Sequence, residues 1–236
     1  MTEQRTAASK PVKRHKKGVW EWLADTTIGN ALRFAWWALV AMAISVLVEW
    51  IGMIWIWGPE HSKEMLHEEI GYLGTFSKNL ITGIYPVDIG LHLVDWANIA
   101  VNFLHLRGIS DWLAKGFLGS ATTIAVYGIE SMINTIFIFA VRSAICVSAL
   151  SGFVLVALVA FIDGLVERDI RKACGGIESA MMYHHAKRLI VPSLFLTFGG
   201  YLTAPISIHP TLIFLPVMGV FAMTIYVTAK SFKKFI

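Results

Sequence analysis

The strongest constraint on the fold is an uncharged stretch of twenty residues, SAICVSALSGFVLVALVAFI, at positions 143–162. A bilayer core of about 30 Å is crossed by about 20 apolar residues in a helix. Asp163 ends this stretch and opens a charged segment, DGLVERDIRKACGGIESAMMYHHAKR, at 163–188. We therefore predict a membrane span at 143–162, followed by a segment at 163–188 that recognises a partner.

Composition excludes an ordinary soluble domain. Of the 236 residues, 56% are hydrophobic and 15% are charged, and the mean hydropathy is +0.63. Soluble domains carry roughly 25% charged residues, so most of this chain lacks the polar surface that water requires. Further apolar stretches precede and follow 143–162. The sequence predicts an all-α polytopic membrane protein with four transmembrane helices, at about 34–57, 143–162, 189–208 and 211–229.

Basic residues predict the orientation. Segments 1–33, 163–188 and 230–236 carry seven, five and three of the twenty Lys and Arg residues. Cytoplasmic segments of membrane proteins are enriched in these residues, which predicts an N-in/C-in topology in a bacterial inner membrane. Segment 1–33 then forms a basic cytoplasmic arm and an interfacial helix, and 230–236 forms a basic cytoplasmic tail. The sequence leaves open whether the arm contacts anionic lipid or DNA.

Segment 58–142 is predicted to lie on the periplasmic side as helices on the membrane surface. Its apolar residues between Met65 and Ile84 recur every three to four positions, as on an amphipathic helix. A single helix over 121–162 would be about 63 Å long, twice the bilayer core. We therefore expect 121–142 to lie outside the membrane, as an extension of the span that packs on the surface helices.

Two charged residues lie within or directly beside the predicted spans. Glu49 falls within 34–57, and Arg142 immediately precedes 143–162. A charged group inside a bilayer is costly unless it is paired, neutral or in contact with water. We predict that Glu49 and Arg142 form an intramembrane ion pair that holds the first two spans together. The alternative is that the first span ends earlier and Glu49 lies at the interface.

The charged segment 163–188 holds the candidate chemistry. Its adjacent histidines point apart on a helix, and no HExxH or equivalent metal-ligand spacing occurs. Its Ser and Cys residues have no nearby base in a recognisable arrangement. We therefore predict no metal, no cofactor and no catalytic residue, and a non-enzymatic protein. The predicted surface for a partner is formed by Asp163, Arg168, Arg171, Tyr183, His184, His185, Lys187 and Arg188.

Four stretches of the chain resemble a known family. They are DGLVERDIRK, YHHAKRLIVP, ISIHPTLIFLP and SFKKFI, and together they resemble the integrating conjugative element membrane protein family. These are bacterial inner-membrane proteins of unknown molecular function. The resemblance implies a role in conjugative DNA transfer by a type IV secretion-like apparatus, and it makes the coupling ATPase a candidate for the docked partner.

A small transporter or channel is the alternative function. It would use Glu49, Arg142 and the last two spans, which contain Pro192, Pro205 and Pro216. Interrupted helices build substrate sites in transporters, although proline also occurs in ordinary membrane helices. The sequence also leaves open whether the chain forms a homo-oligomer.

Overall fold

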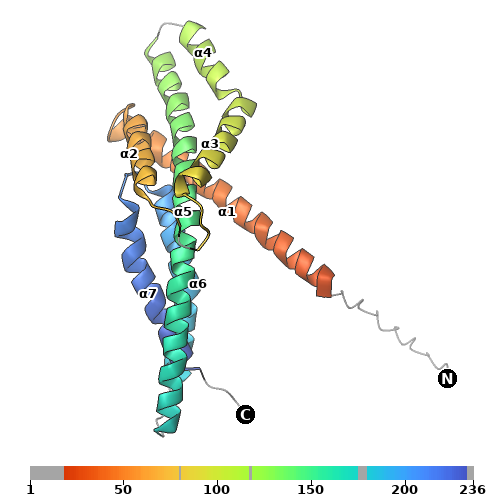
Figure 1. Ribbon diagram of the computed structural model, residues 1–236. Coiled ribbons are helices and arrows are strands. Elements are labelled where there is room, and N and C mark those ends of the chain that lie inside the picture. The colour runs from red at the N-terminus through yellow and green to blue at the C-terminus, as the bar shows by residue number, and fades with distance from the viewer. Residues whose placement is uncertain (1–18, 80, 117–118, 175–179, 233–236) are drawn as a thin grey trace, which may run out of the picture. The chain divides into compact units, whose positions relative to one another are not determined.

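The computed structural model describes residues 19–79, 81–116, 119–174 and 180–232. Every regular element in these residues is a helix (Figure 1). The helices are α1 (Val19–Trp55), α2 (His61–Thr75), α3 (Pro86–Phe103), α4 (Leu106–Gly116), α5 (Ser120–Ala173), α6 (Ala180–Thr203) and α7 (Pro210–Lys230). Most of the predicted basic arm and tail, at 1–18 and 233–236, lies outside the described residues.

The chain divides into two units, Met1–Leu39 and Val40–Ile236. The described part of the first unit is the beginning of α1. No proline interrupts α1, which ends shortly before Gly58 and Pro59. Gly58 has a φ of +82°, a left-handed conformation that glycine adopts at little cost and that commonly ends a helix. The second unit holds the rest of α1 and the six helices that follow it.

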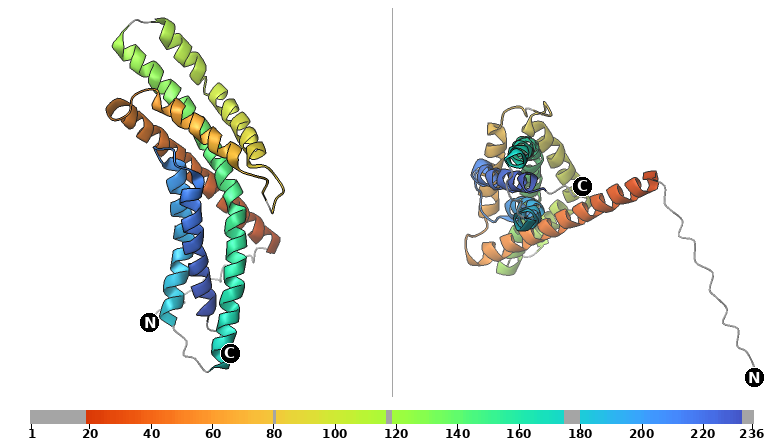
Figure 2. Two further views of the ribbon diagram at one scale, coloured as in Figure 1. Left: turned by 60° about the vertical axis from the view of Figure 1, so that its left-hand side comes forward. Right: turned by 90° about the horizontal axis from the view of Figure 1, so that it is seen from below.

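Helix α5 organises the second unit. It is 54 residues long, or about 80 Å at 1.5 Å per residue. Its N-terminal part packs against α2, α3 and α4, and its C-terminal part packs against α6 and α7 (Figures 1 and 2). Residues 121–142 and 143–162 therefore belong to one uninterrupted helix, which continues past Asp163 to Ala173.

Two apolar clusters stabilise the two parts of α5. The first joins α3, α4 and α5, and its buried members are Ala97, Val101, Leu106, Ile136 and Ala140. The second joins α5, α6 and α7 through aromatic rings. Phe153 lies 5.4 Å from Phe198 and 5.4 Å from Phe221 between ring centroids, in the tilted and edge-to-face arrangements that aromatic pairs prefer.

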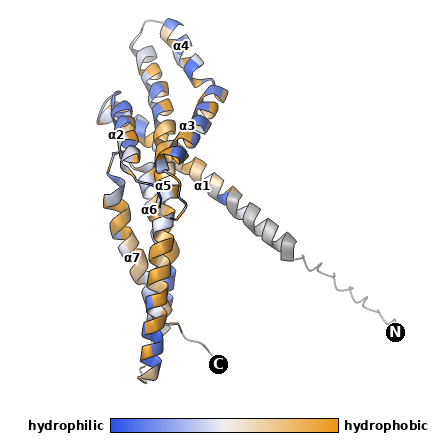
Figure 3. Cartoon of the chain, in the orientation of Figure 1, coloured by the Kyte–Doolittle hydropathy of each residue, from blue (hydrophilic) through white to orange (hydrophobic). Residues whose placement is uncertain are grey.

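Three of the described helices are long and apolar enough to cross a membrane. These segments are Ala35–Trp55, Thr122–Ala173 and Pro210–Lys230. Figure 3 shows the corresponding hydrophobic colouring along α7 and the C-terminal half of α5. Helix α6 does not reach the same hydrophobicity, since Lys187 and Arg188 lie within it and it ends at Thr203. A fourth span and the N-in/C-in orientation stay predictions.

The connection between α6 and α7 is longer than the predicted two-residue link. The sequence placed a span at 189–208, whereas α6 ends at Thr203 and α7 begins at Pro210. Pro205 explains the difference, because a proline disfavours helical backbone in the residue before it. Pro210 then occupies the first turn of α7, and the His209 ring accepts a hydrogen bond from the Thr211 backbone N–H.

Helices α5 and α7 approach each other closely at Gly164. A Cβ atom at this position would lie 2.7 Å from the Ala229 Cβ atom and 2.7 Å from the Tyr226 carbonyl oxygen. Both are parts of α7 that cannot turn aside. The glycine is therefore required by the packing of the two helices.

We expect Gly164→Ala to destabilise the protein by about 1–3 kcal/mol, because the added methyl group must push α5 and α7 apart. The matched control is Gly128→Ala in the same helix, where a Cβ atom would meet nothing within 4 Å. That change should be neutral or stabilising, since glycine inside a helix costs about 0.5–1 kcal/mol relative to alanine. Thermal unfolding in detergent measures the stability of both variants. An equal loss of stability in the two would contradict the close approach of α5 and α7 at Gly164.

Candidate functional site

A buried ion pair lies at the middle of α5. Arg142 and Glu69 are both fully inaccessible to solvent. The Arg142 Nη2 and Nε atoms donate to Glu69 Oε1 over 2.7 Å and 2.9 Å. The carboxylate also accepts hydrogen bonds from the Tyr201 hydroxyl at 2.9 Å and the Ser207 hydroxyl at 3.1 Å. The pair therefore joins α2, α5, α6 and the α6–α7 connection.

The remaining donors of Arg142 also have partners. Nη1 donates to the Ala204 carbonyl oxygen, and Nη2 donates to the Ile206 carbonyl oxygen over 2.8 Å. The guanidinium carbon lies 5.3 Å from the centroid of the Tyr201 ring. These carbonyls are available because the chain leaves helical geometry after Thr203. A buried charge is tolerated when it is paired and its hydrogen-bonding groups are satisfied.

The predicted Glu49–Arg142 pair is wrong. Glu49 is buried, but its carboxylate oxygens lie 3.2 Å and 3.3 Å from the Nδ1 atom of His61. The His61 ring stacks on Trp57 with 4.4 Å between centroids. Glu49 therefore contacts the first residue of α2, whereas Glu69 lies two turns further along α2 and reaches Arg142.

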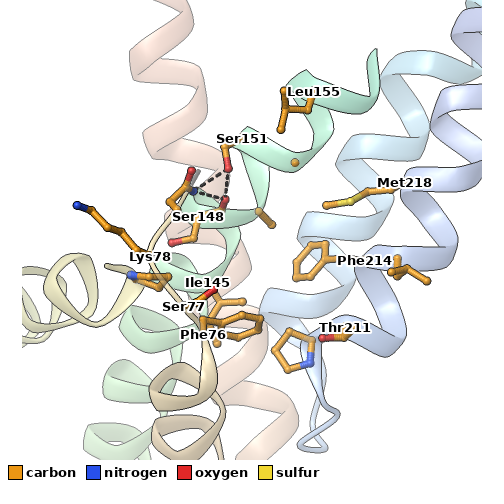
Figure 4. Close-up of a pocket in the computed structure, with 16 residues that line it drawn as sticks. Phe76, Ser77, Lys78, Ile145, Ser148, Ser151, Leu155, Thr211, Phe214 and Met218 are labelled. Carbon is orange, nitrogen blue, oxygen red and sulfur yellow. Dashed lines mark hydrogen bonds between the residues drawn. The ribbon is translucent and has the colours of Figure 1, made fainter. Parts of the chain in front are cut away.

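A cavity of about 440 Å³ lies between the α2–α3 connection, α5 and α7. Asn79 lines it and donates to the Ser148 carbonyl oxygen at 3.0 Å and to the Ser151 hydroxyl at 2.7 Å. Figure 4 shows Ser148 and Ser151 on the α5 side of the cavity. Phe214 and Met218 supply apolar wall from α7. The cavity thus has polar residues from the α2–α3 connection and α5, Lys78 among them, and apolar residues from α7.

Three of the predicted partner-binding residues line a second hollow, near the C-terminal ends of α5 and α7. Arg168 of α5 and Tyr183 and Lys187 of α6 border a groove of about 530 Å³. Arg168 contacts the exposed carboxylate of Asp169 at 3.1 Å. The Lys187 ammonium lies 5.7 Å from the Tyr183 ring centroid. The structure therefore brings these three residues together.

Arg171, another of the predicted partner-binding residues, contacts the end of α7. Its guanidinium donates to the backbone carbonyl of Lys230, at the last turn of α7. The Lys230 ammonium contacts the Glu167 carboxylate at 3.0 Å. Basic side chains are favourable near the C-terminal end of a helix, where the last carbonyls lack partners. Arg171 thus fastens α5 to α7.

The other predicted residues lie at the surface. Asp163 is exposed on α5, and His184, His185 and Arg188 are exposed on α6. Lys172 is exposed in the last turn of α5. This end of the second unit therefore presents Lys172 and Arg188 to the surroundings, beside the groove bordered by Arg168 and Lys187.

The comparison with protein families decides what kind of chain this is. Residues 53–233 match the model of the family described as IncC plasmid conjugative DNA transfer protein DtrJ-like. The chain belongs to the DtrJ-like family. The match extends from the last turn of α1 to just beyond α7, so it includes Arg142 with its partners, the cavity, and the basic residues near the C-terminal ends of α5 and α7. No curated protein and no solved structure matches the chain.

The DtrJ-like match confirms the broader part of the family interpretation. The family is one of conjugative DNA transfer, as the resemblance implied. The match does not extend to the narrower integrating conjugative element membrane protein family that the four stretches indicated, which stays a prediction. Within the described residues of this DtrJ-like chain, no group of three or more His, Cys, Asp or Glu side chains could hold a metal ion.

Sequence reasoning missed Glu69, the central acidic residue of this DtrJ-like fold. The signal was present in the spacing of α2, where the buried residues are Ser62, Met65, Glu69 and Leu73. These positions lie three and four residues apart and share one helix face. A carboxylate on an otherwise buried face requires a buried partner, and Arg142 is the matching cation.

Proposed function

We propose that this protein is a non-enzymatic inner-membrane component of a conjugative DNA-transfer apparatus of the type IV secretion kind. In this proposal the cytoplasmic end of α5, α6 and α7 docks another conjugation protein, such as the coupling ATPase. The observation that carries the proposal is the DtrJ-like match over 53–233, which includes all of the residues placed at this end.

The arrangement of charge supports docking at this end. Lys172 and Arg188 are exposed on two different helices, while Arg171 and Lys230 are engaged in holding α5 to α7. Exposed charges at an interface accelerate association and select partners of opposite charge. The partner's contact surface is therefore expected to be acidic.

The buried ion pair supports a scaffold rather than a transport pathway. A transporter site needs a charged group that a substrate can reach, often at an unwound helix. Arg142 is fully buried and its donors are bonded within the protein. Helix α6 continues through Pro192 and α7 continues through Pro216. We therefore favour docking over the transporter alternative.

The native cysteines provide a test of the orientation. Cys174 is exposed at the end of α5, and Cys146 is buried within the same helix. We expect a membrane-impermeant maleimide to label Cys174 in inverted inner-membrane vesicles and to leave it unlabelled in cells with a permeabilised outer membrane.

The control for this labelling is Lys115→Cys in a Cys174→Ser background. Lys115 is exposed on α4, on the predicted periplasmic side. The introduced cysteine should therefore be labelled in cells with a permeabilised outer membrane and stay unlabelled in inverted vesicles. Labelling of Cys174 from outside the cell would contradict the orientation and, with it, a cytoplasmic docking surface.

Co-purification tests the docking itself. The coupling ATPase of the same conjugative system should co-purify with the wild-type protein from neutral detergent, and Lys172→Glu/Arg188→Glu should abolish recovery. The matched control is Lys78→Glu/Lys115→Glu, which reverses two exposed charges in the α2–α3 connection and in α4. Failure of the wild type to retain the ATPase would overturn this choice of partner.

A further inference from the structure

The groove between the ends of α5, α6 and α7 combines an apolar interior with a basic border. Apolar side chains from all three helices line it, among them Phe161 of α5, Ile190 of α6 and Ile225 of α7. Arg168 and Lys187 also line it. The described residues that line the groove include no acidic side chain.

The basic residues and the apolar wall are separated along the helix axis. Arg168 lies seven residues after Phe161 in the same helix, or about 10 Å further along it. Phe161 belongs to the uncharged stretch of α5, and Arg168 belongs to the charged segment that follows. The groove therefore crosses from the apolar part of the helices to the polar part, as a membrane interface does.

The two basic residues can act on one ligand. Tyr183 and Lys187 are four residues apart on α6, so they share a helix face, and the Lys187 ammonium lies over the Tyr183 ring. The Arg168 side chain is 19% exposed, and its partner Asp169 is 68% exposed and remains hydrated. Surface ion pairs of this kind are weak, so a phosphate can replace the carboxylate.

We propose that this groove binds one anionic phospholipid, with its phosphate between Arg168 and Lys187 and an acyl chain along Phe161, Ile190 and Ile225. This goes beyond the proposed docking, which uses the exposed Lys172 and Arg188. Arginine matches phosphate geometry through paired hydrogen bonds, and basic pockets between membrane helices on the cytoplasmic side suit anionic headgroups.

A lipid fits the groove better than an acidic protein segment or free phosphate. The lining is mainly hydrocarbon and aromatic, which a chain of methylene groups covers and a peptide backbone does not, because its polar groups would lack partners. Free phosphate would use the two cations and leave the apolar walls empty. A phospholipid would contact both the basic residues and the apolar lining of the groove.

Binding can be measured by native mass spectrometry of the full chain in neutral detergent, titrated with phosphatidylglycerol or phosphatidylcholine. We expect one phosphatidylglycerol to be retained at least tenfold more tightly than phosphatidylcholine. Arg168→Gln/Lys187→Gln should lose about tenfold or more in this affinity, since each basic residue contributes severalfold to binding of anionic lipid. Lys172→Gln/Arg188→Gln removes the same charge outside the groove and should keep the wild-type affinity.

A second variant tests the apolar half. Ile190→Trp fills the groove while keeping both charges, and it should also lose the lipid. The proposal is overturned if the two phospholipids bind equally, if the Lys172/Arg188 control loses as much affinity as the groove variant, or if inorganic phosphate competes at the lipid's concentration. Loss of lipid with retained co-purification of the ATPase would separate this site from the docking surface.

Discussion

Replacing Arg142 with alanine is expected to lower the free energy of unfolding by about 3–5 kcal/mol, because Glu69 is left charged and without its ion-pair partner in the protein interior. Glu69→Ala should have a similar effect, since Arg142 is then the uncompensated charge. In a protein of this size such losses lower the apparent melting temperature by roughly 10 °C. Fluorescence-monitored unfolding in detergent measures the shift.

The double variant Arg142→Met/Glu69→Leu distinguishes a lost ion pair from lost packing. It removes both charges and keeps similar side-chain volume, so it should be more stable than either single alanine variant. The double variant should regain only part of the wild-type stability, because Tyr201 and the Ala204 and Ile206 carbonyls also lose their hydrogen-bond partners. A double variant no more stable than the single ones would contradict this account of the pair.

The matched control for Glu69 is its neighbour Glu68, which is exposed on α2. Glu68→Gln should change the melting temperature little, since surface charges contribute less than about 1 kcal/mol. A large loss with Glu68→Gln, or a negligible one with Glu69→Ala, would show that the buried pair does not hold α2 to α5.

The helical architecture was largely predictable because it depends on local sequence. The uncharged stretch at 143–162 forms part of α5, and the apolar stretch at 211–229 forms α7 within one residue at each end. The end of α6 was not predictable from hydrophobicity alone. Residues 204–208 are apolar enough to extend a span, but Pro205 and the hydrogen bonds from Arg142 take the backbone out of the helix.

The partner of Arg142 could not be chosen from hydropathy. Glu49 and Glu69 are both acidic residues, and each lies far from Arg142 in the sequence. Which glutamate pairs with Arg142 depends on how α2 packs against α5, and that packing joins segments far apart in the sequence. The spacing of Ser62, Met65, Glu69 and Leu73 identifies Glu69 as buried, but it does not by itself name the helix that α2 meets.

The basic end was predictable as a group and not residue by residue. Sequence spacing placed Arg168, Arg171, Lys187 and Arg188 on one side of the predicted membrane. It did not separate Arg171, which donates to the Lys230 carbonyl, from the exposed Arg188. Arg171 and Arg188 can be told apart only from the position of α7, whose last turn lies beside α5. This distinction matters because exposed charges are the ones available to a partner.

Conjugative transfer is expected to fall at least roughly 100-fold when Lys172 and Arg188 are both changed to glutamate. Reversed charges facing an acidic partner cost several kcal/mol, and each 1.4 kcal/mol weakens binding tenfold. Both side chains are exposed, so the fold should persist. Immunoblotting for protein level and maleimide labelling of Cys174 for orientation confirm that the variant protein is present and correctly inserted.

The most direct test of the docking surface is therefore the transfer frequency of a deletion strain that carries the Lys172→Glu/Arg188→Glu variant, compared with Lys78→Glu/Lys115→Glu. We predict a loss of at least about 100-fold for the first pair and near-normal transfer for the second. Normal transfer by the Lys172/Arg188 variant at wild-type protein level, or an equal loss in the Lys78/Lys115 control, would contradict docking at this end of the helices.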